Sequence, residues 1–149
     1  MKPLIPIVIA AFFATFGHAQ TTSAEAESVQ IIPADMADLN EFRWKKRPVL
    51  VFADSADDPA FIEQMDLLRA QLNELETRDV VILTDTDPAA RQPLRLRMRP
   101  RGFMLVLVGK DGGIKLRKPF PWSVREVSRS IDKMPMRQRE IREGNALSD

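Results

Sequence analysis

The chain has 149 residues, with 22 Lys and Arg against 21 Asp and Glu, and it contains no cysteine, no tyrosine and a single histidine. This length is sufficient for one domain with a hydrophobic core. The absence of cysteine excludes dithiol redox chemistry and thiolate metal sites. The near-neutral charge gives no overall positive field that would indicate nucleic-acid binding.

Residues 1–19 have the features of a secretory signal peptide. Lys2 precedes the apolar run Leu4–Phe16, and Gly17-His18-Ala19 places small residues at the −3 and −1 positions of a cleavage site. The run is shorter than the roughly 20 apolar residues of a membrane span. We therefore predict a periplasmic or secreted protein with no stable membrane span after cleavage, an uncleaved anchor being the alternative. Residues 20–28 are small and polar and are expected to form a flexible leader.

The segment Arg47–Leu75 predicts a strand, a turn and a helix. Val49–Ala53 is a continuous apolar run, typical of a strand that is buried on both faces. Asp57 or Asp58 is suited to cap the helix, with Pro59 as its first residue. Apolar residues then recur at intervals of three and four, as on one helical face: Ile62, Met65, Leu68, Leu72 and Leu75.

The next segments predict two further pairs of elements. Val80–Leu83 reads as a second buried strand, which makes a right-handed parallel βαβ unit the expected topology. Pro93 predicts a broken helix or a loop over 89–98. Phe103–Val108 and the alternating residues 114–117 predict a β-hairpin around Asp111-Gly112, with positive φ expected at both central turn residues.

A capping box, Ser123 with Glu126, predicts a final helix. Pro135 is expected to stop that helix, and the residues after it read as a charged tail that is not expected to pack fully. A short helix is also expected within 31–42. The domain is predicted to span 29–142, with 143–149 as its tail. The element order is that of a minimal thioredoxin-like α/β fold, a parallel βαβ unit followed by a β-hairpin and a C-terminal helix.

Carboxylates and one hydroxyl follow the two parallel strands of this predicted fold. Because the carboxyl ends of neighbouring parallel strands meet, these residues are expected to lie near one another: Asp54, Ser55, Asp57, Asp58, Asp85 and Asp87. Such a cluster could bind Ca²⁺ or Mg²⁺, or hold one acid with a raised pKa. The alternative is that these residues cap helices and form turns, which is the usual role of Asp-rich turns.

Arginine occupies every second position over a short stretch: Arg95, Arg97, Arg99 and Arg101. If this stretch is extended, four guanidinium groups line one face, with Leu96 and Met98 facing inward. Such an arrangement could bind an anionic polymer, a phosphate-bearing lipid or an acidic partner. The alternative is a solvated face that pairs with the nearby aspartates, each surface pair contributing about 0–1 kcal/mol.

Three stretches, RPVLVFADSADDP, FMLVLVGKDGGIKLR and IDKMPMRQRE, resemble those of a family of exported bacterial proteins that carry a domain of unknown function. This family is related to the thioredoxin- and peroxiredoxin-like modules of sushi-repeat-containing protein and equarin. The resemblance implies a thioredoxin-like fold and an extracytoplasmic location, without an established activity or catalytic residue. Where thioredoxins have two cysteines, this chain has Ser55 and Asp58, and Pro100 is the nearest candidate for their cis-proline.

These observations predict a non-catalytic exported binding module that has no redox cysteine and no cofactor. The aspartate cluster and the arginine row are its candidate recognition surface. The expected partner is a protein or an anionic component of the cell envelope, and not a nucleic acid. The alternative is an enzyme built on the carboxylate cluster, possibly with the assistance of a metal ion.

Overall fold

The computed structural model describes residues 28–147. The predicted signal peptide, and all but the last residue of the predicted leader, lie outside this range. Within it, no helix is both long enough and apolar enough to cross a membrane.

One five-stranded sheet forms the centre of the fold, in the order β1-β3-β2-β4-β5. The three strands β1, β3 and β2 are parallel, whereas β4 runs antiparallel to β2, and β5 antiparallel to β4. The strands are β1 (Ile31–Pro33), β2 (Arg47–Phe52), β3 (Val80–Asp85), β4 (Met104–Val108) and β5 (Ile114–Lys118). The predicted parallel βαβ unit and β-hairpin are confirmed.

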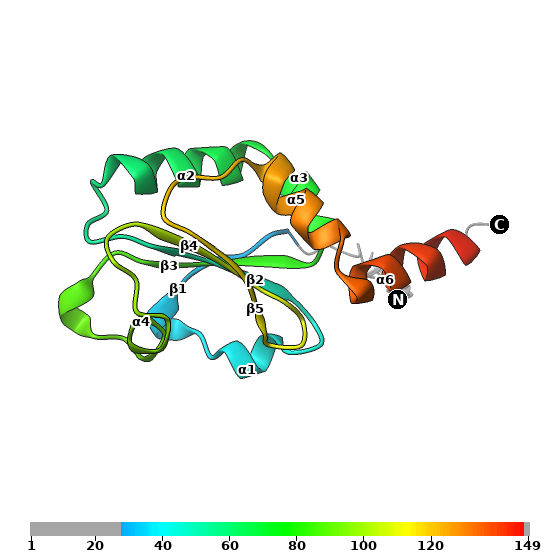
Figure 1. The fold of residues 1–149 in the computed structure, drawn as a ribbon, viewed down its shortest axis with the longest axis horizontal. Helices are drawn as coiled ribbons and strands as arrows, with labels where there is room; N and C mark the ends of the chain where they lie inside the picture. Colours follow the sequence, from blue (N-terminus) through cyan, green and yellow to red (C-terminus); the bar gives the residue numbers. More distant parts are fainter. Residues whose placement is uncertain (1–27, 148–149) are drawn as a thin grey trace, which may run out of the picture.

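Helices cover both faces of the sheet (Figure 1). They are α1 (Leu39–Phe42), α2 (Pro59–Ala70), α3 (Leu72–Glu76), α4 (Pro93–Met98), α5 (Val124–Asp132) and α6 (Pro135–Ala146), with 3₁₀ turns at η1 (Ala34–Met36) and η2 (Pro88–Ala90). In the view of Figure 1, α2, α3 and α5 lie above the sheet, α1 and α4 lie below it, and α6 extends away from the body.

Strand β2 shows how the sheet separates two hydrophobic clusters. Val49 and Val51 pack with the residues of α2, α3 and α5, whereas Leu50 and Phe52 pack with those of α1 and α4. All six residues of β2 are buried, as the continuous apolar run predicts. Each fully buried aliphatic or aromatic side chain contributes about 1.5–3 kcal/mol, so this strand anchors both layers.

The helix starts follow the predicted signals. The Asp58 carboxylate accepts a hydrogen bond from the Ala60 amide at 2.9 Å, and Pro59 is the first residue of α2. Ser123 and Glu126 form the predicted capping box at the start of α5.

Ile62 is not on the buried face of α2, contrary to the prediction: 47% of its surface is exposed. The buried residues of α2 are Gln64, Met65 and Leu68, and Phe61 packs against the same cluster. At about 100° per residue this face is centred on Phe61 and Leu68, and Ile62 lies to one side of it.

The hairpin turn also differs from the prediction. Only Gly112 has positive φ, at +81°, and Asp111 does not. The Gly112 amide donates to the Gly109 carbonyl, and the pairing of β4 with β5 has an irregularity between Leu107 and Val108. A turn over Gly109–Gly112 that ends on a glycine in the left-handed region therefore replaces the expected two-residue turn.

Prolines begin helices at two places where the sequence predicted a break or a tail. Pro93 is the first residue of α4, so 88–98 forms a 3₁₀ turn and then a helix, a broken helix as expected. Pro135 separates α5 from α6 and begins α6, because proline is well suited to the first turn of a helix. The predicted charged tail is therefore helical, and α6 continues past residue 142.

The first segment was only partly predicted. Residues 31–42 form β1, the turn η1 and the four-residue helix α1, which is capped by Asp38. Strand β1 was not predicted, because three residues ending in Pro33 carry almost no strand pattern. No cis peptide bond occurs between residues 28 and 147, so Pro100 is trans.

Candidate functional site

The functional residues predicted from the sequence gather at one edge of the sheet. In the strand register, Phe52 of β2 is opposite both Asp85 of β3 and Met104 of β4, and Leu105 of β4 is opposite Lys118 of β5. Four loops therefore meet at the end of the sheet where β2 and β3 finish, which we call the loop edge. They contain residues 53–58, 86–92, 99–103 and 119–123. The loop edge is where ligands bind in open α/β sheets.

A buried ion pair holds the centre of the loop edge. Arg95 of α4 is 8% exposed, and its Nε donates to an Asp85 carboxylate oxygen at 3.0 Å. Its Nη2 donates to the Ala53 carbonyl at 2.7 Å and to the Asp85 carbonyl at 3.0 Å. The guanidinium also lies 5.6 Å from the centre of the Phe52 ring. Arg95 thus joins the ends of β2 and β3 to α4.

The condition for four arginines on one face, an extended stretch, is not met, because 93–98 is a helix. Residues two apart on a helix are separated by about 200°, so Arg95 points into the protein while Arg97 is exposed. The pairing with a nearby aspartate that the alternative interpretation expected is present for Arg95, but the pair is buried and does not lie on a solvated face. Its partner Asp85 comes from the predicted carboxylate cluster.

Most of the predicted carboxylate cluster forms caps and turns. Asp58 caps α2, and Asp87 caps η2 by accepting from the Ala89 amide at 3.1 Å. Asp85 also accepts from the Asp87 amide at 3.0 Å, and the Ser55 hydroxyl accepts from the Asp57 amide at 3.1 Å. Asp54 is exposed, with one carboxylate oxygen 3.8 Å from Nη1 of Arg95.

Asp54, Asp85 and Arg95 are therefore brought together, but a cation cage is not formed. No group of three acidic side chains between residues 28 and 147 is placed so that it could hold a metal ion. Asp85 directs both carboxylate oxygens to Arg95.

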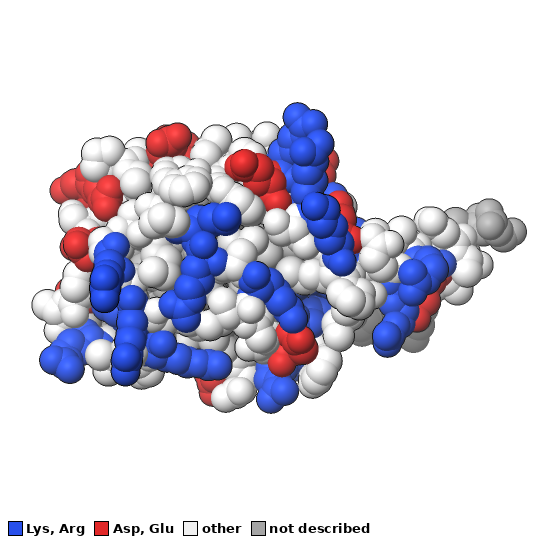
Figure 2. All heavy atoms as spheres, in the orientation of Figure 1, with Lys and Arg blue, Asp and Glu red and all other residues white. Residues whose placement is uncertain are grey.

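Exposed arginines from α4, the loop after it and β5 form a second feature of the loop edge, which we call the arginine patch: Arg97, Arg99, Arg101 and Arg117. The guanidinium of Arg117 donates to the Met98 carbonyl at the end of α4, which places β5 beside α4. Figure 2 shows basic side chains spread over the face on which α4 and β5 lie, with few acidic side chains among them.

None of these four arginines forms an ion pair with an acidic residue in the described part of the chain. The sequence did not indicate that Arg117 belongs to this group. It occupies an alternating position on an edge strand, and only the fold brings that strand beside α4.

Two aromatic residues, Phe120 and Trp122, lie in the loop that follows β5. Lys118 lies 4.4 Å from the centre of the Trp122 ring, and Phe120 is 54% exposed. The side-chain amide of the buried Gln64 holds the Trp122 backbone, donating to its carbonyl at 2.9 Å and accepting from its amide at 2.8 Å. The sequence pattern does not indicate this role of Gln64, because a polar residue on a helix is normally expected to face solvent.

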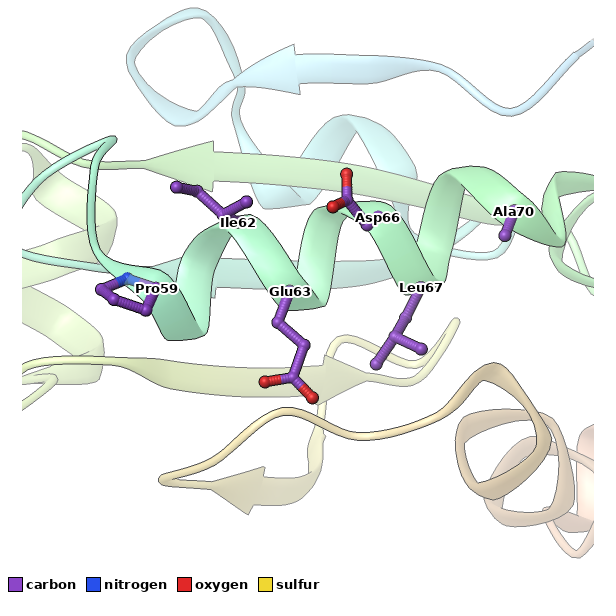
Figure 3. Close-up of a pocket in the computed structure, with 6 residues that line it drawn as sticks. All are labelled: Pro59, Ile62, Glu63, Asp66, Leu67 and Ala70. Atoms are coloured by element: carbon purple, nitrogen blue, oxygen red, sulfur yellow. The ribbon is translucent and has the colours of Figure 1, made fainter.

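The outer side of α2 carries a shallow depression lined by residues of that helix alone (Figure 3): Pro59, Ile62, Glu63, Asp66, Leu67 and Ala70. In Figure 3, Ile62 and Asp66 point to one side of the helix, and Glu63 and Leu67 point to the other. Because one helix supplies the described lining, it is an open surface and has no enclosed volume for a small molecule.

At the opposite edge of the sheet, Glu140 of α6 is held by several cations. Its carboxylate accepts from Nη2 of the buried Arg47 at 2.9 Å and from Lys110 at 2.7 Å. Lys110 also bonds Asp79, at 2.8 Å. Burial raises the pKa of Glu140, but the hydrogen bonds from Arg47 and Lys110 outweigh burial and lower the pKa to about 2.

Three comparisons relate the chain to known proteins. It is 26% identical over 133 residues to coiled-coil domain-containing protein 80 of Danio rerio, covering 69% of this chain but only 15% of that protein's length. Chloroplastic thioredoxin z has a similar structure, with a TM-score of 0.55 and 16% identity, over 71% of this chain and 93% of that one. Plasmodium yoelii Prx1a matches with a TM-score of 0.53 and 16% identity, over 69% of this chain and 81% of that one.

The structural likenesses establish the predicted thioredoxin-like fold and nothing further. The domain of unknown function DUF4174 matches residues 38–140, which include all the residues of the loop edge described above. Since this match covers more than half of the sequence, the chain belongs to the DUF4174 family.

Proposed function

We propose that this chain is a non-catalytic, thioredoxin-like interaction module that binds an anionic partner through the arginine patch. The observation that carries the proposal is that the arginines of the patch are exposed and unpaired. They come from α4, the following loop and β5, and none forms an ion pair with an acidic residue among residues 28–147. Since like charges repel, such a group is stabilised by a bound anion.

The chemistry of arginine favours a partner with carboxylate or phosphate groups. A guanidinium presents a planar set of donors that matches these anions in a two-point geometry, and it is more weakly hydrated than an ammonium group. Patches of one sign also increase the rate at which an oppositely charged partner associates.

A binding role also agrees with what this chain lacks. It keeps the thioredoxin-like scaffold but has no cysteine, and the loop edge holds the Arg95–Asp85 pair instead of a dithiol. Chloroplastic thioredoxin z, which shares the fold, has a type-specific mode of target recognition. By analogy of fold, we propose that the loop edge of this chain also serves recognition.

The proposed location is the periplasm or the extracellular space of a bacterium, supported by the signal-peptide pattern of residues 1–19. The proposed relationship to sushi-repeat-containing protein and equarin rests on the three quoted sequence stretches. The carboxylate-based enzyme is less well supported, because Asp58 and Asp87 cap helices and Asp85 is paired with Arg95.

The test is the affinity of the full chain for polyglutamate, measured by fluorescence anisotropy. The variant R97E/R99E should bind at least about tenfold more weakly, a loss of about 1.4 kcal/mol. The matched control is R125E/R129E, which reverses two exposed arginines on α5, on the opposite face of the sheet. Equal losses in both variants, or no loss in R97E/R99E, would overturn the proposal.

A further inference from the structure

We infer that β5 is a docking edge on which an extended acidic segment of a partner protein pairs as a sixth strand. This inference rests on the proposed function and names the chemistry of the partner and its mode of binding. It starts from the place of β5, which is the last strand of the sheet.

The outer edge of β5 is open in the described structure. β5 pairs with β4 on one side, and no other described strand pairs with it. In the view of Figure 1 β5 lies at the near edge of the sheet, and Figure 2 shows this same side of the molecule. An open edge presents backbone donors and acceptors at the spacing of a strand, and an extended chain can satisfy them.

The side chains of β5 differ between its two faces. Arg117 is opposite Val106 on the α4 side, where it contacts the Met98 carbonyl. Leu116 and Lys118 are opposite Leu107 and Leu105 on the other side, which continues to Trp122. The irregularity beside Val108 interrupts this alternation, so Ile114 is opposite Val108. Ile114 is 40% exposed. An added strand with acidic residues on one face and apolar residues on the other complements both.

Basic residues on edge strands often protect the edge against unwanted pairing, and Lys115 fits that role at the start of β5. Its ammonium group is paired with Asp111 at 2.9 Å, in the hairpin turn. Arg117, nearer the loop edge, has no acidic partner among the described residues. The other three arginines of the patch are not on β5, so protection of this strand does not explain them. An acidic chain that pairs with β5 would instead place its carboxylates near these arginines.

β5 has five residues, so a probe of about seven residues is long enough to span it at 3.3 Å per residue. The experiment uses a fluorescent peptide that alternates Glu and Val, and the same peptide with N-methyl groups on alternate residues. N-methylation keeps the charge and removes the amide hydrogens needed for strand pairing. The unmodified peptide should bind the full chain at least about tenfold more tightly.

Two further measurements separate the inference from the proposed function. Hydrogen exchange should show slower exchange in β5 when the unmodified peptide is bound, and R117E should weaken binding whereas R125E should not.

Inorganic polyphosphate is the comparison ligand, because it is an anion that has no amide groups and cannot pair as a strand. If both peptides bind equally well, and R97E/R99E weakens both, strand addition is overturned while anion binding stands. If neither peptide nor polyphosphate binds, both are overturned.

Discussion

The two edges of the sheet each bury one arginine, and they use it differently. At one edge Arg47 is enclosed with Glu140, Lys110 and Asp79, so that each charged group has a described partner of opposite sign. At the loop edge Arg95 is also buried with Asp85, but the arginine patch beside it is exposed and forms no ion pair with an acidic residue among residues 28–147. The four charged groups around Arg47 balance one another, whereas the arginine patch presents its charge to the solvent. This difference separates residues that hold the fold from residues available to a partner.

The largest expected effect follows from Arg95. Arg95→Met leaves the Asp85 carboxylate buried without its partner, and breaking a buried pair in this way costs about 3–5 kcal/mol. Urea unfolding should show this loss in the free energy of unfolding. In the double variant R95M/D85N the uncompensated charge is absent, and much of the stability should return. A single variant as stable as the parent chain would show that the pair does not hold the loop edge.

Glu140 gives the next effect, and it depends on pH. Its pKa is lowered from 4.5 to about 2, so its contribution is fully present above pH 4.5 and is lost as the pH falls towards 2. The shift corresponds to on the order of 3 kcal/mol. Glu140→Gln should be destabilised by that amount at neutral pH. The difference between the parent chain and this variant should shrink between pH 4.5 and pH 2, and a difference that is constant with pH contradicts the assignment.

A smaller effect distinguishes the carboxylates of the loop edge from one another. Asp58→Ala removes the cap of α2 and should lower the melting temperature by the equivalent of about 1 kcal/mol. Asp57 is exposed and makes no side-chain cap in the described structure, so Asp57→Ala should leave the melting temperature nearly unchanged. Equal effects of the two changes would remove the distinction between a capping and an exposed aspartate.

The smallest effect is expected in the arginine patch itself. Arg97→Gln and Arg101→Gln remove exposed charges that have no ion pair in the described part of the chain. Each should change the free energy of unfolding by no more than about 0.5 kcal/mol, while weakening polyglutamate binding. A large loss of stability would show that these arginines belong to the fold, as Arg95 does.

Much of the fold could be predicted because local signals agreed with one another. The apolar run of β2, the Asp58-Pro59 helix start and the Ser123–Glu126 capping box each act over a few residues, and all are confirmed. Strand β1 could not be predicted, because its pairing with β3 involves residues about 50 positions away and a three-residue strand has little pattern of its own.

The candidate site was predictable in its location but not in its geometry. The rule that parallel strand ends meet placed Asp54 and Asp85 at one edge. The arginines were misread because their spacing of two suggests a strand, while Pro93 starts a helix that turns Arg95 inward. Arg117 and Gln64 could not be assigned from the sequence, since their roles depend on contacts with residues 19 and 58 positions away.

The two hydrogen bonds between the Gln64 side chain and the Trp122 backbone hold Trp122 beside β5, so its fluorescence can report on binding there. The chain has two tryptophans, and Trp44 is 62% exposed and lies beside the hairpin turn, where its amide bonds the Lys110 carbonyl. In a W44F variant the emission comes from Trp122 alone, whose backbone is held by Gln64 and whose indole lies under the Lys118 ammonium group. An acidic chain that attracts Lys118 away from the ring changes the field at the indole, so occupancy of β5 can be followed as a shift in emission without a label.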